Sequence, residues 1–125
     1  MVALGEIMTS DVYTTSPDTP VADVAQAMVK GRIGSAAVLV GGLLVGIFTE
    51  RDVLRAAAGR GDLTGEPVRN WMTEDPVTAT VDEDSEDAAE TMLAGGFRHL
   101  PIIDGTKLVG IVSLRDLLSA RIRRS

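Results

Sequence analysis

The hydrophobic and polar positions of this chain follow one pattern twice. Each copy begins with a short run rich in β-branched residues, at 12–15 and 77–81, which predicts an extended strand. A stretch with apolar residues on one helical face follows, and then two apolar runs joined by a turn. A second stretch of helical period ends each copy. The pattern therefore predicts the order β-α-β-β-α in both halves of the chain.

The first helix of each copy carries start and end signals. Thr19 suits the N-cap and Pro20 the first helical position, and Gly31 predicts the helix end. Gly95-Gly96 predicts the end of the corresponding helix in the second copy. The residues predicted to face inward are Val21, Val24, Ala25, Met28 and Val29 in the first helix, and Ala88, Ala89, Met92 and Leu93 in its copy.

Each pair of apolar runs predicts a β-hairpin. Strands are expected at 36–40 and 43–48, joined by Gly41-Gly42, and at 100–103 and 108–112, joined by Asp104-Gly105. The helices that follow are predicted to face inward with Val53, Leu54 and Ala57, and with Leu117, Leu118 and Ile122.

An internal repeat accounts for this duplication. At an offset of 64, residues 8–56 align with 72–120 without a gap, and 18 of the 49 pairs are identical. We therefore predict repeat 1 at 8–60, a linker at 61–67 rich in turn formers, and repeat 2 at 68–123. The expected fold class is α/β (α+β), with the two β-α-β-β-α repeats packed sheet to sheet around a pseudo-twofold axis. Such packing would create two equivalent clefts.

Composition narrows the possible functions. The absence of cysteine excludes disulfides, thiolate metal sites and cysteine nucleophiles. The chain has a single histidine, His99, which argues against a histidine-based metal site and against a Ser-His-Asp triad. The acidic run at 82–90 suits the first turns of a helix better than a metal site. The net charge of −6 argues against a nucleic-acid partner. We expect no catalysis and no bound metal site.

No segment predicts a membrane or secretory role. Residues 1–8 lack the basic and apolar regions of a signal peptide. The uncharged run 33–49 reaches the lower length limit for a membrane span, but its copy in the second repeat carries Arg98, His99, Asp104 and Lys107. The repeated unit is therefore not a membrane element, and we expect a cytoplasmic protein.

The candidate chemistry lies where the return strand runs into the second helix. The sequence there is Gly-Ile-Phe-Thr-Glu-Arg-Asp at 46–52 and Gly-Ile-Val-Ser-Leu-Arg-Asp at 110–116. A hydroxyl followed three residues later by a carboxylate is typical of a capping box, which by itself only stabilises the helix start. The same pair can also hold a ribose diol beside free backbone N–H groups that favour a phosphate. Its occurrence at matching positions favours the binding role.

These motifs resemble those of a tandem pair of CBS (cystathionine-β-synthase-type) domains, also called a Bateman module. The resemblance rests on Met-Thr at 8–9 and 72–73, on the two corners, and on Arg-His-Leu-Pro-Ile-Ile-Asp at 98–104, and it covers nearly all of 8–121. It implies a regulatory module that binds an adenosine-containing ligand (AMP, ADP, ATP or S-adenosylmethionine), with or without Mg²⁺, in the clefts between the repeats. It also implies a homodimer and regulation of an effector protein. No cofactor is required.

The resemblance also implies the site residues. Thr49 with Asp52, and Ser113 with Asp116, would hold the ribose. Arg98, His99 and Pro101 would border the site of Asp52; Ser35, Ala36 and Ala37 would border that of Asp116; and Thr14 and Thr78 would touch the base. The first repeat departs from the pattern, with Gly34-Ser35 for the Arg-His pair and Ala37 for the proline, so the Asp52 cleft is expected to bind nucleotides more tightly.

Other functions stay open. The main alternative is a structural or interaction CBS pair whose clefts are empty and which dimerises and binds a partner. An enzyme is a third reading, with no visible nucleophile and base to support it. The sequence does not choose among AMP, ADP, ATP and S-adenosylmethionine, nor does it name the effector.

Overall fold

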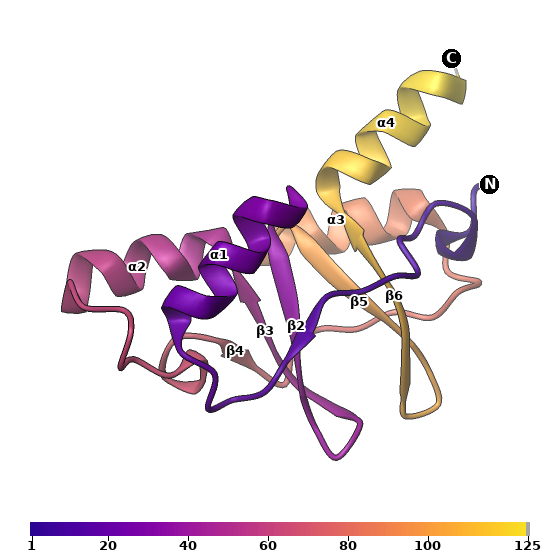
Figure 1. The fold of residues 1–125 in the computed structure, drawn as a ribbon. Coiled ribbons are helices and arrows are strands. Elements are labelled where there is room, and N and C mark those ends of the chain that lie inside the picture. The colour runs from indigo at the N-terminus through magenta and orange to yellow at the C-terminus, as the bar shows by residue number, and fades with distance from the viewer. Residues whose placement is uncertain (125) are drawn as a thin grey trace. The chain divides into compact units, whose positions relative to one another are not determined.

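The helices and the two hairpins of the computed structural model, which describes residues 1–124, follow the predicted order in both halves (Figure 1). The first half contains β1 (Thr14–Thr15), α1 (Val21–Gly31), β2 (Ser35–Val40), β3 (Leu43–Thr49) and α2 (Glu50–Arg60). The second contains β4 (Thr73–Glu74), α3 (Ser85–Gly95), β5 (His99–Asp104), β6 (Lys107–Ser113) and α4 (Leu114–Arg124). Short 3-10 helices lie at Leu4–Glu6 and Val68–Asn70. The mixed α/β class and the twofold repetition are confirmed.

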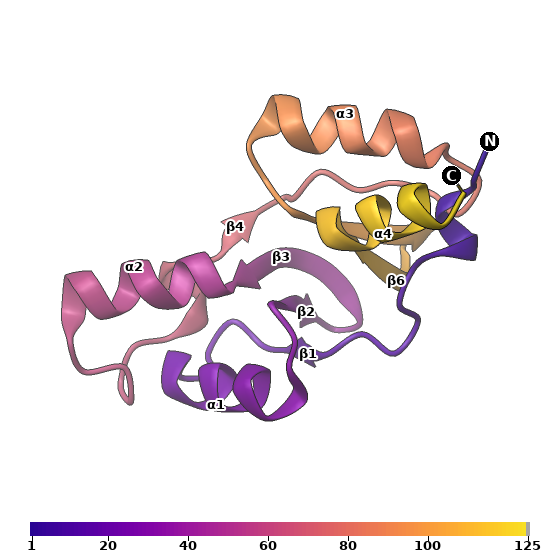
Figure 2. The same cartoon turned by 90° about the horizontal axis from the view of Figure 1, so that it is seen from above.

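The residues divide into two compact units. The first-repeat unit is Tyr13–Pro76, and the second-repeat unit is Met1–Val12 together with the described residues from Val77 onward. Each unit thus contains the two helices of one repeat and a short arm from the other side of the linker. Figure 2 shows α1 beside α2 and α3 beside α4.

The first-repeat unit is built on a four-stranded sheet of order β1-β2-β3-β4. The β2–β3 hairpin turns through Gly41 and Gly42, whose φ values are +57° and +82°. Two consecutive positive φ angles give the turn that matches the twist of a hairpin, and glycine adopts them without strain. β4 extends the sheet on the far side of β3, where Thr73 pairs with Ile47.

The second-repeat unit has the equivalent arrangement with fewer regular strands. β5 and β6 form an antiparallel hairpin. The strand predicted at 77–81 is reduced to one parallel bridge between Ala79 and Ile102. On the other edge, Thr9 bridges to Ile111 in the place that β4 takes in the first-repeat unit. The second copy of the predicted first strand is therefore wrong as a strand, although its backbone occupies the expected edge.

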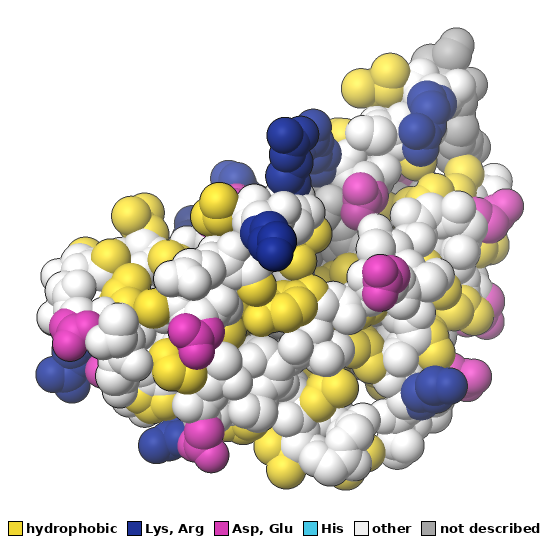
Figure 3. Space-filling view, viewed as in Figure 1, with side chains coloured by type: hydrophobic (Ala, Val, Ile, Leu, Met, Phe, Trp, Pro, Cys, Tyr) yellow, Lys and Arg dark blue, Asp and Glu magenta, His cyan; other side chains and the backbone are white. Residues whose placement is uncertain are grey.

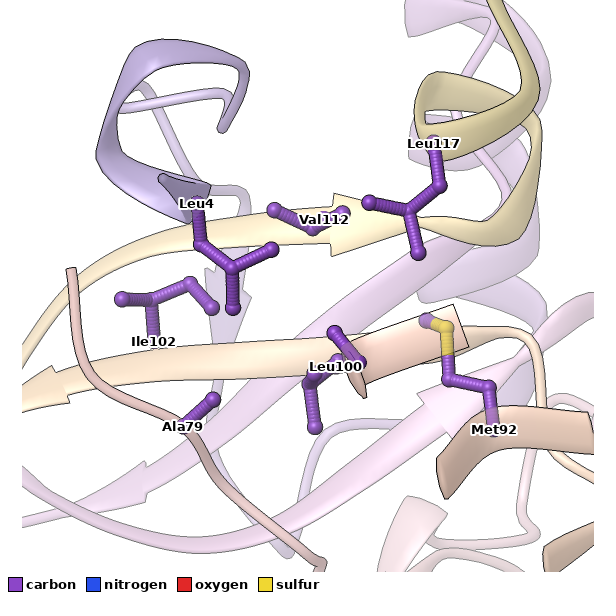
Figure 4. Close-up of a cluster of buried hydrophobic side chains, with 8 residues drawn as sticks. Leu4, Ala79, Met92, Leu100, Ile102, Val112 and Leu117 are labelled. Carbon is purple, nitrogen blue, oxygen red and sulfur yellow. The ribbon is translucent and has the colours of Figure 1, made fainter. Parts of the chain in front are cut away.

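A hydrophobic core lies between sheet and helices in each unit, and Phe48 is the largest side chain buried in that of the first-repeat unit. In the second-repeat unit, Leu4 of the N-terminal 3-10 helix packs against β5, β6, α3 and α4 (Figure 4). The side chain of Leu4 is fully buried, which contributes on the order of 1.5–3 kcal/mol. The matching core of the first-repeat unit contains Val68 from the second 3-10 helix. Each 3-10 helix therefore completes the hydrophobic core of one unit.

The start and end of α1 differ from the prediction. The N-cap is Pro20, and the Thr19 hydroxyl lies 3.0 Å from the Ser16 hydroxyl instead of capping the helix. The first N–H groups of α1 donate to loop carbonyls instead, Val21 to Glu66 at 2.8 Å and Ala22 to Leu63 at 3.1 Å. α1 includes Gly31, and the left-handed residue that ends it is Arg32, with φ 55°. Gly96 ends α3 as predicted.

The predicted inward faces of the helices are too wide. Val21, Val24 and Met28 are buried as predicted, whereas Ala56 replaces Ala57 as the buried alanine of α2. Six residues predicted to face inward lie exposed: Val29, Leu54, Ala57, Leu93, Leu118 and Ile122. Figure 3 shows apolar side chains reaching the visible surface among charged ones. Within residues 1–124, no helix has the length and apolarity needed to cross a membrane.

Candidate functional site

The first corner joins β3 directly to α2. Thr49 is the N-cap of α2, and Asp52 follows it three residues later, in the first turn of the helix. The Oδ2 atom of Asp52 accepts a hydrogen bond from the Thr49 backbone N–H at 2.9 Å and one from the Thr49 hydroxyl at 3.3 Å. Asp52 is only 5% exposed. The corner therefore holds a buried carboxylate in a fixed orientation at the start of a helix.

Arg55 occupies the other carboxylate oxygen of this corner. Its Nη1 donates to Asp52 Oδ1 at 2.9 Å, one helical turn away. The guanidinium lies 5.5 Å from the ring centroid of Trp71, and Nη1 is 3.5 Å from the Trp71 carbonyl oxygen. A guanidinium over an indole face is attracted by the ring's electron density. Arg55 is therefore held between the corner and Trp71.

Trp71 is itself fixed by Glu66. The indole N–H donates to Glu66 Oε1 at 3.0 Å, and the Asn70 side-chain amide donates to the same oxygen at 3.1 Å. The hydrogen bond from Asn70 is the largest cause that lowers the pKa of Glu66, and the hydrogen bond from Trp71 and the charge of Arg60 lower it further. A chain of polar contacts thus runs from Asp52 to the segment that follows the linker.

The second corner joins β6 to α4 and forms a reciprocal capping box. The Ser113 backbone N–H donates to Asp116 Oδ2 at 3.0 Å, and the Asp116 N–H donates to the Ser113 hydroxyl at 3.0 Å. Asp116 is half-buried. Among the residues that the structure describes, no cation forms a salt bridge with Asp116. The predicted hydroxyl–carboxylate pairs are present at both corners, but their surroundings differ.

The remaining predicted residues of the first repeat lie at the same end of their sheet as the first corner. Ser35 is the cross-strand partner of Thr49, and Ala36 and Ala37 follow it as buried residues. Thr14 pairs in parallel with Ala37 and is exposed. The first-repeat unit therefore brings Thr14 and the segment from Ser35 close to the Thr49 corner.

The second-repeat unit groups its residues in the same way. His99 is the cross-strand partner of Ser113, and the Arg98 carbonyl accepts from the Leu114 N–H at 2.8 Å. Pro101 is buried, and its carbonyl accepts from the N–H of Ala79, the neighbour of half-buried Thr78. Arg98 is exposed and His99 half-buried. Because Arg98, His99 and Asp52 belong to different compact units, the pairing that the resemblance implies for them stays a prediction.

Arg55 is the residue that sequence reasoning missed. It lies three residues after Asp52, a spacing that places oppositely charged side chains side by side on a helix. The offset of 64 aligns Arg55 with Ser119, so the two repeats differ at this position. That difference was a readable signal of unequal corners. Within residues 1–124, no group of three or more histidine, aspartate or glutamate side chains is arranged to hold a metal ion.

Known sequences match along nearly the whole chain. The model of the CBS domain family matches residues 4–59 and 68–123. An uncharacterized 17.7 kDa protein of Acidianus ambivalens is 42% identical over 119 residues, which cover 94% of this chain and 71% of that protein. The CBS domain-containing protein YhcV of Bacillus subtilis is 33% identical over 117 residues, covering 94% of this chain and 84% of that one.

Solved structures resemble the chain over a similar extent. The CBS-domain containing protein ATU1752 of Agrobacterium tumefaciens gives a TM-score of 0.90 at 31% identity, covering 96% of this chain and 99% of that one. Two neighbours were solved with AMP. CBSX2 gives a TM-score of 0.85 at 26% identity, covering 99% of this chain and 98% of that one. The CBS domain protein PAE2072 of Pyrobaculum aerophilum gives a TM-score of 0.85 at 26% identity, covering 99% of this chain and 100% of that one.

Proposed function

This chain belongs to the CBS domain family, and we propose that it is a regulatory ligand-sensing module that binds an adenosine-containing nucleotide without catalysing a reaction on it. The observation that carries the proposal is the duplicated corner. In both repeats a carboxylate is held at the start of a helix by the backbone N–H of a Thr or Ser three residues before it. Neighbours of the same family with similar structures bind AMP.

The corner chemistry suits a ribose. A carboxylate accepts both hydroxyls of a cis-diol through charge-assisted hydrogen bonds, which are the stronger class. We propose Asp52 with Thr49, and Asp116 with Ser113, as the ribose-binding residues. Arg98 and His99 are proposed as phosphate donors, because one is always charged and the other is a nitrogen donor. Thr14, Thr78, Ser35, Ala36 and Pro101 are proposed to border the base or the sugar.

Calorimetric titration tests this function. The purified protein is titrated with adenosine, AMP, ADP, ATP and S-adenosylmethionine, and ATP is tested with and without Mg²⁺. We expect saturable binding of at least one adenosine ligand, with Mg²⁺ acting only through the phosphates that it accompanies. Guanosine and cytidine serve as controls. Absence of binding by every adenosine ligand would contradict the proposal and favour a structural or interaction CBS pair.

The exposed apolar residues favour a homodimer. Val29, Leu54, Leu93 and Ile122 are 80%, 71%, 69% and 73% exposed, and all lie on helices. Large apolar side chains on helix surfaces mark interaction sites when they form a patch. We propose that these helices contact a second copy, and that a cytoplasmic effector protein reads the ligand state. Light scattering that gives the monomer mass of 13.2 kDa at micromolar concentration would contradict the dimer.

A further inference from the structure

The two corners differ in how many hydrogen-bond acceptors they leave for a ligand. A carboxylate offers about four lone-pair sites. At Asp52, three are used: two by Thr49 and one by Arg55. At Asp116, one is used, by the Ser113 N–H, as far as the described residues show. A ribose diol brings two donors, so it fits the free sites of Asp116 but exceeds those of Asp52.

We propose that Arg55 is a specificity-determining residue that makes the corners unequal: Asp116 accepts a ribose diol directly, whereas Asp52 accepts one only by giving up Arg55. This inference rests on the proposed function of the corners. The matching position in the second repeat is Ser119, whose short neutral side chain does not substitute for the guanidinium. The difference between the two corners therefore depends on one pair of aligned residues, Arg55 and Ser119.

The contacts of Arg55 make it exchangeable. Its side chain is 56% exposed, whereas that of Asp52 is 7% exposed. Water can take up the released guanidinium, while the carboxylate needs a replacement donor because it is buried. A diol supplies that replacement. Trp71 holds the guanidinium from the other side, so release from Asp52 changes the surroundings of the chain's single tryptophan.

Reciprocal substitutions test the inference with adenosine, which carries no phosphate. Asp116→Ala protein reports on the first corner, and Asp52→Ala protein on the second. Adding Arg55→Ser to the Asp116→Ala protein should tighten adenosine binding about three- to fivefold, the scale of one part-exposed ion pair. Adding Ser119→Arg to the Asp52→Ala protein should weaken it by a similar factor. Arg51→Ser removes the same charge from α2 without touching Asp52 and serves as the matched control.

Each outcome decides a different question. If Asp116→Ala protein binds adenosine but Arg55→Ser leaves its affinity unchanged or weaker, the role of Arg55 is wrong while the proposed function stands. If the unmodified protein binds neither adenosine nor AMP, the proposed function fails first. Thermal melting shows whether Arg55→Ser is folded. Independently of that variant, adenosine should change the Trp71 fluorescence of Asp116→Ala protein, and binding without such a change would also overturn the exchange.

Discussion

Met72 packs against the backbone of Gly46 so closely that a β-carbon on Gly46 would lie 2.7 Å from the Met72 sulfur. The carbonyl oxygen of Thr73 would lie 3.0 Å from the same β-carbon. Met8 and Gly110 form the matching contact in the second-repeat unit. The Met-Thr pairs therefore have a packing role: each lays its methionine on the glycine of a return strand. A larger residue at Gly46 would therefore force the Met72 side chain or the Thr73 carbonyl to move.

Gly46→Ala should destabilise the fold by about 1–3 kcal/mol, the usual cost of extra volume in a packed site. The neighbouring Thr73 carbonyl belongs to a paired strand, so it cannot move aside as freely as the methionine side chain. Urea unfolding followed by circular dichroism measures the change. Gly65→Ala is the control, because nothing lies within 4 Å of a β-carbon there. Equal stability of the two variants would contradict this packing role.

Much of the fold could be predicted because its signals are local. The hairpins follow from Gly41-Gly42 and Asp104-Gly105, and the repeat of 64 residues fixes the element order. The capping of α1 could not be predicted. The N–H groups of Val21 and Ala22 donate to the carbonyls of Glu66 and Leu63, more than forty residues away in sequence. Capping rules consider only residues next to the helix start in sequence, so they do not predict such distant acceptors.

The corners of the candidate site were also predictable, whereas the contact of Arg55 with Asp52 was not predicted. Thr49 with Asp52 and Ser113 with Asp116 follow from a spacing of three residues. Arg55 lies at the same spacing from Asp52, but its contact with Trp71 joins positions 16 apart, which no local pattern reports. Pairing between residues of different repeats depends on tertiary structure for the same reason.

Glu66→Gln should remove a pH-dependent part of the stability. The pKa of Glu66 is lowered from its ordinary value of 4.5, first by the hydrogen bond from Asn70. A lowered pKa stabilises the fold above the ordinary value, and that stability is lost as pH falls through the folded-state pKa. The melting temperature of the native protein should therefore exceed that of Glu66→Gln at pH 7, and the gap should shrink below pH 4.5. A gap that is constant between about pH 7 and about pH 3 would contradict this assignment, because the glutamate side chain titrates within that range.

Leu54→Glu should shift the protein from dimer to monomer. Leu54 lies on α2 and is 71% exposed, so a charge there has little effect on the fold of the monomer but a desolvation cost in an interface. Sedimentation velocity at micromolar concentration measures the mass. Leu43→Glu is the control, because Leu43 is 53% exposed at the start of β3 beside the hairpin turn. A dimer of unchanged strength in Leu54→Glu would exclude this face of α2 from the interface.

Removing a ribose hydroxyl should weaken binding sharply. A hydrogen bond to a charged group contributes about 1.5–3 kcal/mol, so 2′-deoxyadenosine should bind at least about tenfold more weakly than adenosine. Asp116→Ala and Asp52→Ala should each lower adenosine affinity at their own corner. Because each aspartate also caps its helix, the loss of about 1 kcal/mol in folding stability is measured in parallel. Equal affinity for adenosine and its 2′-deoxy analogue would contradict the diol role.

The two corners should also differ in their preference for a phosphate. Asp52 forms a salt bridge with Arg55, so the pair carries no net charge, whereas Asp116 has no such partner among the described residues. A ligand phosphate is repelled by an uncompensated carboxylate, and a guanidinium released from Asp52 would attract it. The ratio of AMP affinity to adenosine affinity should therefore be larger in Asp116→Ala protein than in Asp52→Ala protein. Because exposed charges are screened, raising the salt from about 0.1 M to 1 M should narrow the difference. Calorimetry with both ligands in both variants measures the four affinities, and a larger ratio in Asp52→Ala protein would show that phosphate donors elsewhere in the chain outweigh Arg55.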